Sequence, residues 1–232
     1  RGPEFEQTRP WEEMAPRIGQ DQHPVWCKVI DQAQAMVLPY QIRSGKPYPI
    51  KAVLGFGLNH RMWPAPDFMK DSLQKLDFFV NVELFLTESA KLADIVLPAC
   101  STFERSELLI TPTRYAIWTE PVIPPVGQSR SDMDIVSDLG KRLTPQDELL
   151  SQGQEACLDW IYAPSGVTIA ELRQHPGGLP LSNLPETPYE KYRTAGFPTP
   201  SGKMEFTSLV LKEFGIDPLP VYREPRQSPV SD

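Results

Sequence analysis

Three short apolar segments constrain this chain more than any other feature of its sequence. They lie at residues 50–56, 77–82 and 93–98, and each has the length of a buried strand rather than of a helix. Residues 67–76 have apolar side chains at helical spacing after a suitable N-cap at Asp67, and 87–92 have room only for a short helix. Because strands separated by helical segments pair in parallel through right-handed crossovers, the pattern predicts an α/β layer.

Further segments flank this layer. Apolar residues recur at three- and four-residue steps over 25–43, which predicts an amphipathic helix that Pro39 kinks or ends. Residues 115–118 are predicted to add a strand. Ser131 is a suitable N-cap for a helix that reaches Leu143, and we expect this helix to cover the same sheet.

Proline content distinguishes the rest of the chain. The 232 residues include 26 prolines, which shorten helices and strands and lengthen loops. Residues 1–23 are predicted to form an irregular arm, of which 1–5 resemble a cloning remnant. The α/β domain is predicted to span 24–144, and 145–232 to form a proline-rich wrapping segment with little core of its own.

Local signals predict short elements within the proline-rich segment. Helices are expected near 154–162 and 168–174, and a short strand at 203–206. A last helix is expected at 208–214, where Gly215 stands at the position after the helix end that favours glycine.

Composition excludes several functional classes. Against 23 Lys and Arg stand 30 Asp and Glu, a formal net charge of −7, which argues against binding to nucleic acid. The three cysteines are scattered, so neither a thiolate zinc site nor a cysteine-only iron–sulfur cluster fits, and we interpret them as buried thiols. The sequence has no apolar window of the length that a membrane helix needs, and it starts without a targeting signal.

The predicted topology directs attention to the loops after the three strands. Ligands of open parallel sheets bind at the carboxyl ends of the strands, where loops present backbone N–H groups. Gly57 would let a phosphate approach the backbone, Asn59 offers amide donors, and Glu83 suits a ribose hydroxyl or a guanine N–H pair. These residues together predict a nucleotide pocket.

Structural roles compete with these functional ones. Asn59 can form an Asx turn, which spacing alone favours, and Thr87 or Ser89 can be a simple helix cap. His60 is expected on a surface loop, and Glu104 is expected to pair with Arg105 and so pin the third loop. No Walker A or G-x-G-x-x-G run is present, and the three histidines lie in loop or proline-flanked sequence, so we expect no self-contained catalytic site.

The motifs nevertheless occur in a specific order. Gly57-x-Asn59 precedes Leu76-Asp-Phe-Phe-Val-x-Val-Glu83, and Thr87-Glu-Ser89 precedes Ala93-Asp-Ile-Val-Leu-Pro98 and Phe103-Glu-Arg105. This series resembles the molybdopterin oxidoreductases of the dimethyl sulfoxide reductase family. The similarity continues to Thr199-Pro-Ser-Gly-Lys-Met-Glu-Phe206 and covers most of residues 40–225.

The resemblance implies a fold and a cofactor. It implies a three-layer αβα, mononucleotide-binding (Rossmann-like) domain with a mostly parallel sheet, and an enzyme that holds Mo or W between two molybdopterin guanine dinucleotides. By position, Gly57, Asn59, His60, Glu83 and Thr87 would contact the guanosine diphosphate end of one dinucleotide. His60 stands where the family commonly has Pro, and Glu83 where it commonly has Asp.

The resemblance also implies that the chain is an inactive internal fragment of a longer catalytic subunit. Its partners would be the remaining domains of that subunit and an electron-transfer subunit, and an iron–sulfur cluster would belong to the parent rather than to this part. The parent would be cytoplasmic or periplasmic. Two alternatives stay open: a relative without pterin, as in the large iron–sulfur subunit of respiratory NADH dehydrogenase, and an unrelated α/β nucleotide-binding or interaction domain.

Overall fold

The computed structural model describes residues 15–30, 32–111, 115–181, 189–219 and 221–224. The chain divides into two compact units, one containing residues 39–185 together with 1–10 and the other containing 11–38 and 186–232. The predicted domain boundary after residue 144 stays a prediction.

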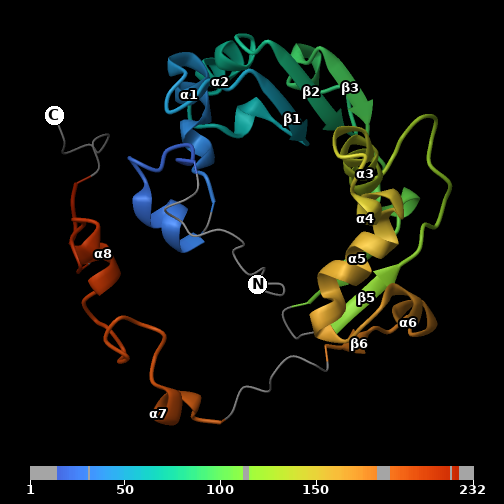
Figure 1. Ribbon diagram of the computed structural model, residues 1–232. Coiled ribbons are helices and arrows are strands. Elements are labelled where there is room, and N and C mark those ends of the chain that lie inside the picture. Colours follow the sequence, from blue (N-terminus) through green and yellow to red (C-terminus); the bar gives the residue numbers. More distant parts are fainter. Residues whose placement is uncertain (1–14, 31, 112–114, 182–188, 220, 225–232) are drawn as a thin grey trace. The chain divides into compact units, whose positions relative to one another are not determined.

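The unit around residues 39–185 contains the predicted parallel sheet. Its strands are β1 (Ala52–Phe56), β2 (Phe78–Glu83) and β3 (Ile95–Pro98), which lie side by side in the order β1-β2-β3 (Figure 1). Both pairings are parallel, with Leu54 opposite Val80 and Val80 opposite Ile95. The prediction of an α/β layer from three apolar segments is therefore confirmed.

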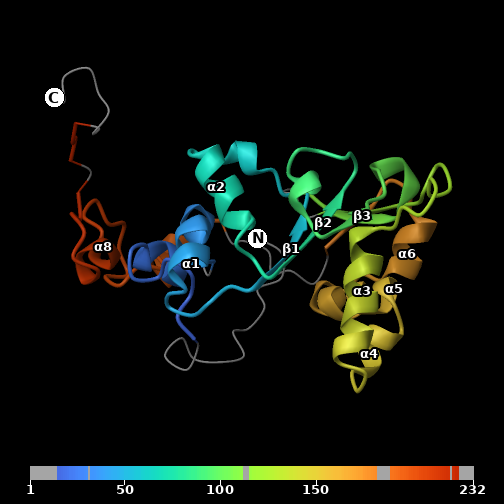
Figure 2. The ribbon, with the colours of Figure 1, turned by 90° about the horizontal axis from the view of Figure 1, so that it is seen from above.

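Helix α2 (Pro66–Leu73) connects β1 to β2 on one side of the strands (Figure 2). Met69 and Leu73 of this helix are buried, as is Phe79 of β2. The helix begins with Pro66 in its first turn and has no side-chain cap, so the prediction of Asp67 as N-cap is wrong. Proline explains the difference, because its fixed φ and missing N–H suit the first helical position.

Helix α3 (Asp132–Leu143) lies on the other side of the strands (Figure 2). The Ser131 side chain accepts a hydrogen bond from the Asp134 N–H, which confirms the predicted N-cap. Arg130 forms a parallel bridge with Ala99, so the chain enters α3 directly beside the end of β3.

A second, antiparallel sheet follows in the same unit. It consists of β4 (Glu107–Ile110), β5 (Tyr115–Thr119) and β6 (Leu179–Pro180), of which the sequence predicted only β5. Helices α4 (Glu148–Ser151), α5 (Gln154–Tyr162) and α6 (Ile169–Gln174) belong to this region. Its core consists of six buried residues, Ala116, Trp118, Val167, Ile169, Leu172 and Leu181.

Four of those six core residues lie beyond residue 145. The expectation of little core there is therefore wrong for the segment that ends at Leu181. Helix α6 begins with a capping box formed by Thr168 and Glu171 and places apolar side chains in the core. The high proline content of this segment gave no indication of that packing.

The other unit contains short helices. They are the π-helical turn Trp26–Ile30, the 3₁₀ turn Ala35–Val37, α7 (Lys191–Ala195) and α8 (Leu209–Glu213), while α1 (Leu38–Ser44) begins at the unit boundary. The predicted single helix over 25–43 is wrong, because the structure is non-helical at 32–34. Pro39 lies in the first turn of α1, where proline starts a helix rather than ending one.

Of the two elements predicted near the end of this unit, the helix is confirmed and the strand is wrong. The Ser208 side chain caps α8 by accepting from the Leu211 N–H, and Gly215 follows the helix with a φ of 68°, as expected. The predicted strand at 203–206 is wrong. Thr199 Oγ1 donates instead to the Lys203 carbonyl (2.7 Å), so a turn engages the backbone where the strand was expected to start.

Two observations apply to the described residues as a whole. The longest helix among them, α3, has 12 residues, so this part of the chain has no helix with the length and apolar character required to cross a bilayer. The three cysteines are buried thiols, as interpreted from the sequence.

Candidate functional site

The loops that follow β1, β2 and β3 meet at one edge of the parallel sheet, called here the carboxyl edge (residues 57–60, 83–89 and 99–104). The Gly57 N–H donates to the Val82 carbonyl (2.9 Å), and the Ala99 N–H donates to the Glu83 carbonyl (3.1 Å). These bonds continue the strand pairing beyond the last residues of β1 and β3. The structure thus brings together the segments that carry the predicted site residues.

Two glycines shape the loop after β1. At Gly55 a Cβ atom would lie 2.8 Å from Leu58 Cβ, so only glycine lets the loop fold back over the strand this closely. Gly57 has a φ of 58°, and no atom lies within 4 Å of the position that a Cβ would take. This second glycine combines a left-handed backbone with open space, which permits a ligand to approach the main chain.

Asn59 caps the turn that follows. Its Oδ1 accepts from the Arg61 N–H (3.1 Å), at the start of the 3₁₀ turn His60–Met62. The Asx-turn interpretation is confirmed. The amide nitrogen lies on the same half-buried side chain and is the group available for a ligand acceptor.

His60 is only 5% exposed, so the expectation of a surface loop residue is wrong. Its backbone N–H donates to Ser89 Oγ (2.9 Å), and its Nδ1 lies 2.7 Å from the same hydroxyl. Burial, together with the charges of Arg61 and Lys70, lowers the pKa of His60 below its usual range, so the imidazole is neutral at neutral pH. His60 therefore joins the first loop to the second.

The second loop carries Glu83 and Thr87. Glu83 ends β2 and is half-buried, and its Oε1 accepts from the Leu84 N–H (2.9 Å). Thr87 Oγ1 accepts from the Ala90 N–H (3.1 Å), so it fixes the start of the 3₁₀ turn Ala90–Leu92, although Ser89 is the N-cap residue of that turn and its side chain makes no cap hydrogen bond. Glu88 is exposed and pairs with Lys91 (2.6 Å), so Glu83 is the carboxylate that the strand end holds in place.

Glu104, in the third loop, has a role that its sequence pattern did not predict. Its carboxylate accepts from the Ser101 N–H (2.7 Å), the Val126 N–H (2.6 Å) and the Ser129 hydroxyl (3.1 Å). These bonds, with those from Ser101 the strongest, lower the pKa of Glu104 to about 2. Glu104 thus holds the turn before α3 against the carboxyl edge.

The predicted ion pair between Glu104 and Arg105 is wrong. The Arg105 guanidinium lies instead 3.6 Å from the Glu107 carboxylate and 3.8 Å from the Asp132 carboxylate. The cause is that the backbone donors around Glu104 occupy its carboxylate. The nearest sequence signal was the spacing Ser101-x-x-Glu104, which is that of a capping box.

The carboxyl edge has the groups of a binding site rather than those of a catalytic one. Amide donors, a strand-end carboxylate and the exposed cation Arg61 suit an anionic nucleotide. No group of three or more potential metal-ligating side chains occurs within the described residues. The neutral His60 contacts a serine that already accepts a backbone hydrogen bond, so this pair serves to fix the loops.

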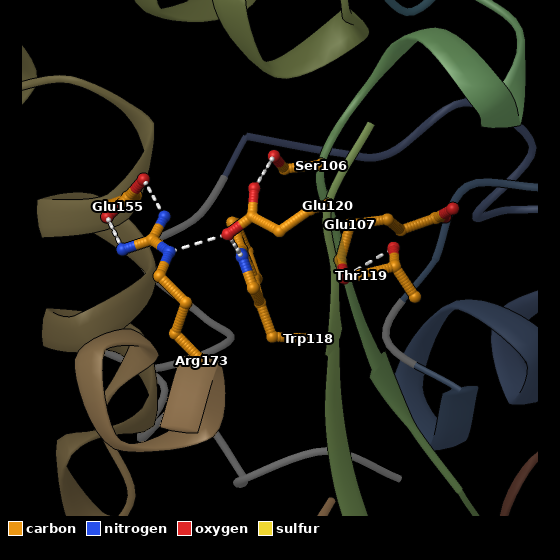
Figure 3. A network of polar contacts seen from close by, with 7 residues as sticks. All are labelled: Ser106, Glu107, Trp118, Thr119, Glu120, Glu155 and Arg173. Atoms are coloured by element: carbon orange, nitrogen blue, oxygen red, sulfur yellow. Dashed lines mark hydrogen bonds and ion pairs between the residues drawn. The ribbon is translucent and has the colours of Figure 1, made fainter. Parts of the chain in front are cut away.

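A second polar cluster, beside the antiparallel sheet, is shown in Figure 3. Arg173 donates to Glu120 (2.5 Å) and to Glu155 (2.6 Å), and the Trp118 indole N–H also donates to Glu120 (2.7 Å). The Arg173 guanidinium holds the pKa of Glu120 below its usual range. Each of these groups contacts another member of the cluster, so its role is to join β5, α5 and α6.

Comparisons with known proteins agree with the motifs at the carboxyl edge. The sequence model of the molybdopterin oxidoreductase family matches residues 45–142, which include all three strands of the parallel sheet, α2 and most of α3. Acetylene hydratase of Syntrophotalea acetylenica is 30% identical over 193 residues, 81% of this chain and 26% of that protein. The thiosulfate reductase molybdopterin-containing subunit PhsA of Salmonella typhimurium is 30% identical over 212 residues, 78% of this chain and 26% of its own length.

A solved structure agrees with the sequence matches. Acetylene hydratase from Pelobacter acetylenicus superposes with a TM-score of 0.72 at 28% identity, covering 87% of this chain and 28% of that one. The chain thus spans about a quarter of the length of the relatives it matches. The α/β region of the chain is a domain of the molybdopterin oxidoreductase family.

Proposed function

We propose that this chain is part of the catalytic subunit of a molybdenum- or tungsten-dependent oxidoreductase, in which it binds the guanosine diphosphate end of one molybdopterin guanine dinucleotide. The observation that carries the proposal is the meeting of Gly57, Asn59 and Glu83 at one sheet edge. The matches to proteins about four times as long support a role as one part of a larger subunit.

The residues at the carboxyl edge fit such a ligand. The open space at Gly57 admits a diphosphate to the backbone, and the Asn59 amide and Arg61 supply a donor and a positive charge. The Glu83 carboxylate, fixed by the Leu84 N–H, can accept the two N–H groups of a guanine. His60 and Thr87 hold the loops in position rather than contacting the base.

When bound in the parent, the cofactor supplies a metal that exchanges two electrons with the substrate. The residues of this chain orient the nucleotide end, which is the usual share of a protein in cofactor chemistry. The remaining domains of the subunit supply the metal environment, and an electron-transfer subunit is its expected partner. The chain alone is therefore expected to be inactive.

The metal and nucleotide content of the full-length subunit tests this proposal. We expect Mo or W together with about two GMP per subunit after acid hydrolysis, one from each dinucleotide. Glu83→Gln is expected to reduce the GMP content toward one, because an amide cannot accept both guanine N–H groups. Glu88→Gln is the matched control, because that neighbouring carboxylate is exposed and pairs with Lys91.

One alternative has a specific observation in its favour. Asn59 Oδ1 and Thr87 Oγ1 already accept local backbone hydrogen bonds, and His60 is buried against Ser89, as expected of a relative that keeps the fold without the pterin. Iron without Mo, W or GMP in the purified subunit would establish this structural alternative and refute the cofactor-binding role.

A further inference from the structure

A buried amide in β2 lies beneath the loop that follows β1. Asn81 is 0% exposed, although asparagine is mostly found at protein surfaces. Its side chain shares a face of the strand with the buried Phe79, two residues earlier, and in the parallel pairing Asn81 lies opposite Gly55. Burying an amide costs free energy that only hydrogen bonds offset, so the partners of Asn81 matter.

The two polar atoms of this amide differ in their partners. Nδ2 donates to the Leu58 carbonyl (3.4 Å), and because a carbonyl can only accept, the nitrogen must be the atom that faces it. Oδ1 is buried and has no hydrogen-bond partner among the described residues. A buried amide oxygen without a donor destabilises a fold. An apolar side chain at position 81 would therefore suit stability better, and the contact with Leu58 is what the amide adds.

Gly55 makes room for this contact. A Cβ atom at residue 55 would lie 3.2 Å from Asn81 Oδ1 and 2.8 Å from Leu58 Cβ. The absence of a side chain at residue 55 thus lets the amide and the loop approach each other. Gly55 and Asn81, on adjacent strands, together hold the Leu58 carbonyl in place.

The loop held in this way has two N–H groups without a partner. From Gly57 to Trp63 every N–H donates a hydrogen bond except those of Leu58 and Asn59, for which the described residues provide no acceptor. Both residues are half-buried, and they directly follow Gly57, where no atom lies within 4 Å of the position of a Cβ. Free backbone N–H groups beside open space are the donors that phosphate groups bind in nucleotide sites.

Asn81 determines the direction of one of these donors. The Leu58–Asn59 peptide bond is trans, so its carbonyl and its N–H point in opposite directions. Because the Leu58 carbonyl points at the buried Asn81 amide, the Asn59 N–H points away from it. Without the Asn81 donor, the Leu58 carbonyl would have no partner among the described residues and would be free to turn toward water, which would turn the N–H inward.

We propose that Asn81 is a positioning residue that orients the Leu58–Asn59 peptide and so presents the Asn59 N–H to the diphosphate of the bound nucleotide. This inference rests on the proposed function and adds to it a residue that touches no ligand. Asn81 lies within the sheet and acts through the loop. It lowers the stability of the domain in order to fix a donor before the ligand arrives, and such local costs are expected at functional sites.

Substitution of Asn81 in the full-length subunit separates positioning from stability. Asn81→Val removes both amide polar atoms and keeps a side chain that strands favour. We expect its melting temperature to equal or exceed that of the wild type, because the buried oxygen without a donor is gone. We expect its GMP content after acid hydrolysis to decrease from about two per subunit toward one, because the Asn59 N–H no longer faces the diphosphate.

Phe79→Leu is the matched control. Phe79 lies on the same strand and the same face and is 2% exposed, but its side chain has no polar group to hold the loop. This control should lower the melting temperature by several degrees and keep about two GMP per subunit. Asn81→Ala is the second variant should Asn81→Val fail to fold, and it should lower both the melting temperature and the GMP content.

Two results would overturn the positioning role. One is an Asn81→Val subunit that contains as much GMP as the wild type. The other is a loss of GMP in Phe79→Leu as large as in the Asn81 variant, since reduced stability alone would then explain both losses.

Hydrogen exchange of residues 57–62 separates this inference from the proposed function. A wild-type subunit without Mo, W or GMP would refute the cofactor-binding role. In such a subunit, exchange of this loop at least about threefold faster in Asn81→Val than in Phe79→Leu would keep Asn81 as the residue that orients it, and equal exchange would refute that as well. A loaded wild type together with an equally loaded Asn81→Val would refute the positioning role and keep the cofactor-binding role.

Discussion

The antiparallel sheet β4-β5-β6 packs against helices of the same unit around a buried core, whereas apolar side chains of the parallel sheet β1-β2-β3 line a groove. Trp118 and Ala116 of β5 are 5% and 0% exposed beneath the helical segment that contains Ile169 and Leu172. Leu54 and Ile95, in contrast, line a groove of about 620 Å³ between the parallel sheet and α3, called here the open groove. The difference indicates that the antiparallel sheet has a core that the groove face of the parallel sheet does not share.

Truncation in the closed core should have the largest effect. Leu172→Ala removes a side chain that is 1% exposed, and we expect it to reduce the free energy of unfolding by about 2–5 kcal/mol, because the lost contacts leave a cavity. Chemical denaturation followed by circular dichroism measures the change. A loss below about 1 kcal/mol would show that this core is no better packed than the open groove.

The parallel sheet was predictable because its strands and their connections are local. Each strand is a short apolar run, and its neighbour in the sheet is the next run along the chain. Strand β6 has no such signal, because it is two residues long and pairs with β5 about sixty residues earlier in the sequence. Its pairing depends on contacts that no local pattern encodes. Strand β4 was missed although it pairs with the next strand along the chain, β5.

At the candidate site, too, the positions set by strand order were predictable and the long-range side-chain contacts were not. The position of Gly57, Asn59 and Glu83 follows from strand order, so topology alone predicted that they meet. The burial of His60 depends on Ser89, and the role of Glu104 depends on backbone groups as far away as Val126. A single sequence gives no indication of which distant hydroxyl or N–H reaches a given side chain.

Glu104 provides a pH-dependent test of how the turn before α3 is held. Its pKa is lowered to about 2 in the folded state from an ordinary value of 4.5. A lowered carboxyl pKa contributes stability that is present above the unfolded pKa and is lost as the pH falls through the folded one. We therefore expect the melting temperature to decrease between about pH 4.5 and pH 2.

Glu104→Gln should decrease the melting temperature by a few degrees at neutral pH and flatten this acid dependence. Glu88→Gln is the control, because that exposed carboxylate has one partner, Lys91, and no role in the turn. Differential scanning calorimetry at several pH values measures both variants. An unchanged acid slope in Glu104→Gln would mean that the hydrogen bonds to Val126 and Ser129 contribute nothing to stability.

Removing one helix cap in each region compares how strongly α3 and α6 are held. Ser131 caps α3, the wall of the open groove, and Thr168 caps α6, which packs on the closed core. Each substitution to Ala should cost about 1 kcal/mol, because it leaves a first-turn N–H without its acceptor. Urea denaturation with fluorescence detection gives both values. A much smaller cost for Ser131→Ala would indicate that α3 is held less firmly than α6.

The smallest effect is expected at Leu54, which is 37% exposed and lines the open groove. Leu54→Ala should cost about 1 kcal/mol or less, because the truncation creates no closed cavity there. Chemical denaturation of the chain with and without the substitution measures the difference. A cost above about 2 kcal/mol would mean that Leu54 belongs to a closed core, and the contrast between the groove and the core of the antiparallel sheet would then be wrong.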